Sequence, residues 1–134
     1  MATITDIEGI GEVYANKFRE AGVRTTEALL QKGATVKGRK ELAKETGFTT
    51  KMILEWVNRA DLYRVNGIGS QYADLLEAAG VDTVRELAIR KADTLMETLA
   101  RVNAKKNKVN QLPGAKQVAD WVKKAKSLKK VVEY

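Results

Sequence analysis

The feature that most constrains the fold of this chain is a phrase that occurs twice. Residues 7–29 read IEGIGEVYANKFREAGVRTTEAL, and residues 65–87 read VNGIGSQYADLLEAAGVDTVREL. At an offset of 58 positions, 10 of the 23 residues are identical. Such self-similarity means that one supersecondary unit is present in two copies. In each copy a Gly-Ile-Gly loop opens a short helix, and a later glycine ends it.

Nearly every segment has the pattern of a helix. The only proline is Pro113, and no stretch alternates apolar and polar residues long enough to predict a strand. In the first copy we expect helices over residues 12–21 and from Thr25 to about Lys32. In the second copy, Thr83 and Glu86 are expected to form a capping box at the start of the corresponding helix.

The helical period also predicts which side chains face the core. In the first helix the expected apolar face includes Val13, Ala15 and Phe18. Tyr14 and Tyr72 occupy equivalent positions in the two copies. We expect both to be packing residues, in the core or half-buried.

A variable pair of helices follows each copy. We expect these helices over residues 37–46, 50–64, 93–104 and 115–128. The last helix of each pair carries a tryptophan, Trp56 or Trp121, in a matching apolar pattern. Both tryptophans are therefore predicted to anchor the core.

The predicted architecture is all-α and multi-helical, of the SAM-like kind. It consists of two pseudo-repeated halves, residues 1–64 and 65–134, packed as one compact unit. A chain of 134 residues is long enough to bury a core of this size.

The composition excludes several classes of function. The chain has no cysteine and no histidine, so the common zinc sites and the Ser/His and Cys/His nucleophile pairs cannot form. We expect no enzymatic activity, no catalytic residue and no cofactor. No apolar run approaches 18 residues, and no secretory signal is visible. We therefore expect a cytoplasmic protein without a membrane partner.

The net charge of +7 is concentrated at one end of the chain. Residues 1–100 carry 14 basic and 15 acidic side chains, whereas residues 101–134 carry 10 basic and 2 acidic ones. In a helix over residues 115–128, lysines lie opposite the apolar face that contains Trp121. Such an asymmetry favours a polyanionic partner.

The glycine loops resemble those of the helix-hairpin-helix superfamily. The matching segments are residues 7–11 and 65–69, with Ala15 and Ala73 at the small position in the following helix. Almost the whole chain is also similar to an uncharacterised family of tandem helix-hairpin-helix-like proteins, described as a domain of unknown function. The segment 112–114 resembles a degenerate further hairpin.

The resemblance implies sequence-independent binding to a nucleic-acid backbone, DNA rather than RNA. Loop amides would contact phosphate, sometimes with a monovalent cation bridging loop carbonyls and phosphate. This chain departs from the pattern directly after each loop, where the usual Lys or Arg is missing. Those positions hold Glu12 and Val13 in the first copy, and Ser70 and Gln71 in the second.

Two functions remain open at this stage. In the first, the hairpin amides and the lysines bind nucleic acid. The residues expected to take part are Gly9, Gly11, Lys17, Gly67, Gly69, Lys105, Lys106, Lys108, Lys116, Lys123, Lys124, Lys126 and Lys130. In the second, the protein is a protein–protein interaction or scaffold module that keeps the hairpins only as structural corners.

Overall fold

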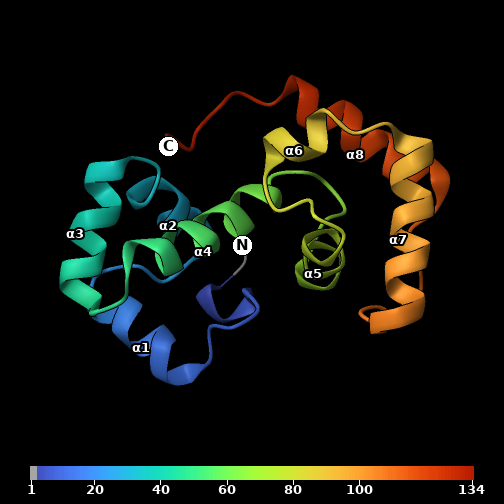
Figure 1. Cartoon of the computed structure of the whole chain (residues 1–134). Coiled ribbons are helices and arrows are strands. Elements are labelled where there is room, and N and C mark those ends of the chain that lie inside the picture. The colour runs from blue at the N-terminus through green and yellow to red at the C-terminus, as the bar shows by residue number, and fades with distance from the viewer. Residues whose placement is uncertain (1–2) are drawn as a thin grey trace. The chain divides into compact units, whose positions relative to one another are not determined.

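The computed structural model describes residues 3–134, and these residues hold eight α-helices and one 3₁₀ helix (Figure 1). Within residues 3–134 the only β pairing is an isolated bridge that joins Thr3 to Thr25. The prediction of an all-α, multi-helical fold is therefore confirmed. The chain divides into two compact units. The first is made of two segments, the chain up to Asp61 and Lys130–Tyr134, and the second comprises Leu62–Lys129.

The first unit contains the 3₁₀ helix and four α-helices. These are η1 (Ile4–Asp6), α1 (Glu12–Glu20), α2 (Thr26–Lys32), α3 (Val36–Thr46) and α4 (Thr50–Leu62), whose last residue opens the second unit. The hydroxyl oxygen of Thr25 caps α2 by accepting a hydrogen bond from Ala28 N–H, at 3.0 Å. Gly47 ends α3 in the left-handed conformation, at φ 83°.

The core of the first unit is built around aromatic rings. Phe18 is fully buried, and its ring lies 5.2 Å from that of Phe48 and 5.6 Å from that of Trp56. Tyr14 packs edge-on against Phe48 at 4.9 Å. The expectation for Val13 is wrong, because 71% of this residue is exposed. At about 100° per residue, Val13 points away from the face that carries Phe18.

The last five residues of the chain belong to the first unit. Val132 is buried, and Glu133 N–H donates a hydrogen bond to Ala34 O at 2.7 Å. The buried guanidinium of Arg39, on α3, donates to the carbonyl oxygens of Ala34 and Glu133. This segment is therefore fixed to α3 and to the loop before it by backbone and side-chain hydrogen bonds.

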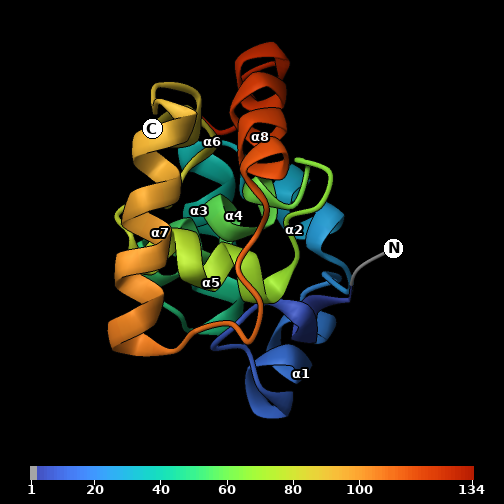
Figure 2. The same cartoon turned by 90° about the vertical axis from the view of Figure 1, so that its right-hand side faces the viewer.

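The second unit contains four complete helices. They are α5 (Ser70–Ala78), α6 (Val84–Ala88), α7 (Ala92–Lys106) and α8 (Ala115–Ser127). Helices α6 and α7 both pack against α8, and α5 packs against α7 (Figures 1 and 2). Trp121 anchors this core at 1% exposure, as predicted. The connection from α7 to α8 runs through residues 107–114, which form no helix and can be followed in Figure 2.

The ends of the helices in the second unit follow ordinary capping chemistry. The hydroxyl oxygen of Thr83 accepts a hydrogen bond from Glu86 N–H at 3.0 Å, which confirms the half of the predicted capping box that Thr83 makes. Helix α7 continues to Lys106 and ends at Asn107, a left-handed residue with φ 51°. Helix α8 ends at Ser127 and the backbone then becomes extended. Lys130 therefore does not lie on α8, and the prediction that it shares the lysine face of that helix is wrong.

Candidate functional site

The two glycines of each Gly-Ile-Gly loop have different backbone conformations. The first glycine of each pair, Gly9 or Gly67, has a positive φ, of 91° and 90° respectively. Only glycine adopts this conformation without strain. The second glycine, Gly11 or Gly69, has an extended backbone and forms the N-cap of the helix that follows. The two copies thus share one loop geometry, which leads directly into α1 or α5.

The tryptophan of the last helix lies against the first glycine of each loop. A Cβ atom on Gly67 would stand 3.1 Å from Trp121 Nε1 and 3.2 Å from Gln117 Nε2. In the first unit, a Cβ atom on Gly9 would stand 3.7 Å from Trp56 Nε1. The glycine is therefore needed for its backbone conformation and, at position 67, also for the close approach of two nitrogen atoms.

A cavity adjoins each loop. The one at the second loop has a volume of about 570 Å³, and the one at the first loop about 240 Å³. The larger cavity is lined by Gly67, Gly69, Ser70, Gln71, Tyr72, Asn110 and Gln111. The smaller is lined by Gly9, Gly11, Glu12, Val13 and Tyr14. The first backbone N–H groups of α1 and α5 lie at these cavities, where they have no intrahelical partner.

The connection between α7 and α8 is held next to α5. Tyr72 O–H donates a hydrogen bond to Gln111 O at 3.2 Å, and Lys108 Nζ lies 3.5 Å from a carboxylate oxygen of Asp74. The ring of Tyr72 in turn packs on Trp121 at 5.3 Å, and Tyr72 is half-buried, as predicted. Residues 107–114 therefore form one wall of the larger cavity.

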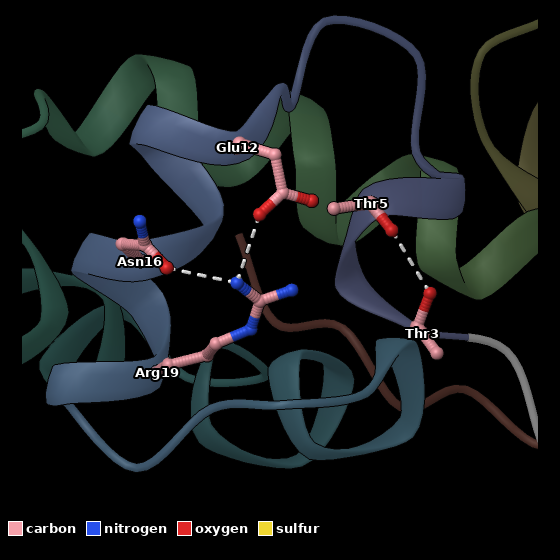
Figure 3. Close-up of polar contacts among 5 residues, drawn as sticks. All are labelled: Thr3, Thr5, Glu12, Asn16 and Arg19. Carbon is pink, nitrogen blue, oxygen red and sulfur yellow. Dashed lines mark hydrogen bonds and ion pairs between the residues drawn. The ribbon is translucent and has the colours of Figure 1, made fainter.

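The two loops differ in the charge of the residues that surround them. Around the first loop the chain carries the acidic residues Asp6, Glu8 and Glu12, and the positions 58 residues later hold Arg64, Asn66 and Ser70. Figure 3 shows the polar contacts of Glu12 with its neighbours on α1. Its carboxylate accepts a hydrogen bond from Arg19 Nη1 at 3.2 Å, and the same nitrogen donates to Asn16 at 2.8 Å. An acidic side chain at the start of α1 repels anions that the helix N-terminus would otherwise attract.

The predicted lysines are all exposed, but they fall in three places. Lys105 and Lys106 lie in the last turn of α7, and Lys108 follows in the connection. A second group lies on α8 and consists of Lys116, Lys123, Lys124 and Lys126. The third place is the first unit, which contains Lys17 on α1 and Lys130 in the C-terminal segment.

The second unit thus contains Gly67, Gly69 and seven of the nine predicted lysines. The prediction did not include Gln117, whose amide approaches Gly67. The two tryptophan helices align at an offset of 65 positions, and Gln117 then corresponds to Met52. The replacement of an apolar side chain by a polar one, within an otherwise matching pattern, is the sequence feature that could have identified Gln117.

The family assignment follows from the same repeated elements. A family model described as Domain of unknown function (DUF4332) matches residues 8–128, which contain both glycine loops and both tryptophan helices. The chain belongs to this family. No curated protein and no solved structure matches the chain. In this family member, none of the helices within residues 3–134 has the length and apolar character needed to cross a membrane. The same residues contain no group of three or more Asp or Glu side chains that could hold a metal ion.

Proposed function

We propose that this protein binds nucleic acid without sequence preference, DNA rather than RNA, by contacting phosphate groups and without catalysis. The observation that carries the proposal is the charge of the second unit. Residues 62–129 hold 13 basic and 7 acidic side chains, a net charge of +6, and the lysines of α7 and α8 are exposed. Exposed lysines act as point charges that replace counterions on phosphates.

The second glycine loop supports the same function. Its flanking residues carry no acidic side chain between Arg64 and Gln71, and the N-terminus of α5 offers free N–H groups. The resemblance to helix-hairpin-helix proteins adds that such loops contact the phosphate backbone, in some cases with a monovalent cation at the loop carbonyls. The absence of histidine and cysteine from the sequence supports a binding role over a catalytic one.

A salt-dependent titration tests the proposal. Fluorescence anisotropy with labelled duplex DNA, single-stranded DNA and RNA at low ionic strength should show binding that weakens steeply as salt is added. Similar affinities for unrelated sequences are expected, because phosphate contacts carry no sequence information. If no nucleic acid binds at low salt, the proposal is overturned.

A second candidate function is a protein–protein interaction module, supported by the first unit. Beside the first glycine loop, Val13 is 71% exposed and Tyr14 is 38% exposed, and Glu8 and Glu12 flank them. Exposed apolar side chains with a charged rim are typical of protein contacts. Reversing the charge of the α8 lysines distinguishes the two functions, since it would abolish nucleic-acid retention only in the first.

A further inference from the structure

We propose that the first unit binds a small organic phosphate monoester in a cavity lined by residues of α3 and α4. This inference goes beyond the proposed function, because the cavity lies in the first unit and does not involve the lysines of α7 and α8. The cavity has a volume of about 280 Å³, and its lining residues are Val36, Arg39, Lys40, Thr50, Lys51 and Leu54. The charge of this lining, the burial of one cation and the presence of two apolar side chains carry the proposal.

Every charged side chain that lines the cavity is a cation. Arg39, Lys40 and Lys51 contribute three positive charges, and no carboxylate belongs to the lining. Among residues 3–134, neither lysine forms an ion pair. Thr50 and Lys51 are also the first two residues of α4, so the positive end of that helix dipole adds to the charge. The cavity therefore attracts anions.

The most constrained of these cations is Arg39, which is only 5% exposed. Its guanidinium has no carboxylate partner among residues 3–134, and its three hydrogen bonds go to the backbone carbonyl oxygens of Gly33, Ala34 and Glu133. A guanidinium has five N–H donors, so two of them remain for an acceptor in the cavity. Buried cations are nearly always paired with an anion, because burial removes the water that stabilises their charge. An anion in the cavity supplies the missing countercharge.

The corresponding helix of the second unit shows that the fold itself does not need these cations. Counted from the first residue of α3 and of α7, Arg39 corresponds to Leu95 and Lys40 to Met96. Leu95 is 1% exposed and belongs to the core. Arg39 also holds the C-terminal segment, but Lys40 takes no part in that contact. The pair of cations on α3 therefore serves a purpose that is specific to the first unit.

The lining also indicates which anion fits. A phosphate monoester carries up to two negative charges and three acceptor oxygens, which suit an arginine and two lysines better than the single charge of a carboxylate does. Val36 is 42% exposed and, together with Leu54, gives the cavity an apolar wall. The volume lies just below the range of about 300–1,000 Å³ that is typical of drug-sized ligands, so the organic part of the ligand is small.

An NMR titration of the full chain tests the site with phenyl phosphate, inorganic phosphate and phenol as probes. Phenyl phosphate should shift the amide signals of Thr50 and Lys51 and the methyl signals of Val36 and Leu54. We expect it to bind at least about fivefold more tightly than inorganic phosphate, because its ring contacts the apolar wall. If inorganic phosphate binds as tightly, the cavity takes an adventitious ion only and the proposal is overturned. Shifts confined to α8 would overturn it as well.

A double variant removes two of the three cations without disturbing Arg39. Lys40→Gln combined with Lys51→Gln should weaken the binding of phenyl phosphate roughly tenfold, because both lysines attract the phosphate group. Lys37→Gln combined with Lys44→Gln is the charge-matched control, since both lysines are exposed on α3 and neither lines the cavity. Circular dichroism melting shows whether the variants are folded. Equal losses from the two folded double variants would contradict the proposal.

A substitution in the apolar wall separates the organic part of the ligand from its phosphate. Leu54→Asn should lower the affinity for phenyl phosphate to that for inorganic phosphate and leave the latter unchanged. An unchanged preference for phenyl phosphate in this variant would show that the ring does not lie in the cavity. The outcome is independent of DNA binding. Absence of phenyl phosphate binding overturns this inference and leaves the proposed function standing, and absence of DNA binding does the reverse.

Discussion

At the residue scale, the two glycines of the second loop make different demands on the backbone. Gly67 has φ 90° and would place a Cβ atom 3.1 Å from a buried indole nitrogen, whereas Gly69 has an extended backbone and open space around it. We expect Gly67→Ala to lower the free energy of unfolding by about 1–3 kcal/mol. Gly69→Ala should change it by less than about 1 kcal/mol. Urea denaturation of both variants measures the difference, and equal effects would contradict this account of the loop.

The burial of Arg39 allows a second prediction at this scale. Its guanidinium donates hydrogen bonds to three carbonyl oxygens, those of Gly33, Ala34 and Glu133. Arg39→Met keeps much of the apolar stem but removes all three of these hydrogen bonds, and should cost about 2–4 kcal/mol of stability. Lys40→Met, at the exposed neighbouring position, is the matched control and should be nearly neutral. Thermal unfolding compares the two.

At the element scale, the capped start of α6 carries a prediction about a very short helix. Helix α6 spans only five residues, and the hydroxyl oxygen of Thr83 satisfies one of the N–H groups at its start, that of Glu86. Thr83→Ala should lower the free energy of unfolding by about 1 kcal/mol. Thr83→Ser keeps the hydroxyl oxygen and should retain most of that stability. A serine variant as unstable as the alanine variant would show that the methyl group, and not the cap, matters.

The lysines of α8 carry the prediction that concerns function. Lys123→Glu, Lys124→Glu and Lys126→Glu together should abolish most DNA binding at low salt. Removing three phosphate contacts should also reduce the slope of log affinity against log salt by about 3. The same exchange at Lys37, Lys40 and Lys44, which are exposed on α3, is the charge-matched control. Equal losses from both triple variants would mean that net charge, and not α8, determines binding.

The elements also show what the sequence could and could not predict. Repeated glycines and threonines mark loops and caps that depend on neighbouring residues only, so the starts of α1, α2, α5 and α6 could be predicted closely. The end of α8 was predicted to within one residue, but Lys130 was wrongly assigned to its lysine face because the backbone is already extended at Leu128. Val13 was wrongly assigned to the buried face of α1, because a single apolar residue near the start of a helix can lie on its buried or its exposed face.

The same reasoning applies to the candidate site. The glycines and lysines could be identified because residue types and their spacing along the chain can be read directly from the sequence. The approach of Gln117 to Gly67 joins residues 50 positions apart, and no local pattern encodes that distance. Comparing the two copies position by position, Met52 against Gln117 and Glu12 against Ser70, is what makes the difference between the loops apparent.

At the scale of the whole molecule, the C-terminal segment supports a prediction about the first unit. Val132 is buried there, and Tyr134 O–H donates a hydrogen bond to Asn58 at 2.7 Å. Deleting residues 130–134 removes these contacts and the backbone bond to Ala34. We expect the deletion to lower the melting temperature and to speed amide exchange in α3 and α4. A chain without these residues that exchanges at the same rates would contradict the assignment of this segment to the first unit.

The division of the chain has a practical consequence for anyone who cuts the gene in two. The polypeptide starts in the first unit, passes through the whole of the second, and returns to the first for its last five residues. The second unit is therefore an insertion in the first, although the sequence repeats read as a head-to-tail duplication. A fragment of residues 62–129 carries a complete unit, whereas a fragment that stops near residue 61 lacks part of its own core. A fragment meant to represent the first unit therefore has to include residues 130–134 as well as the residues up to Asp61.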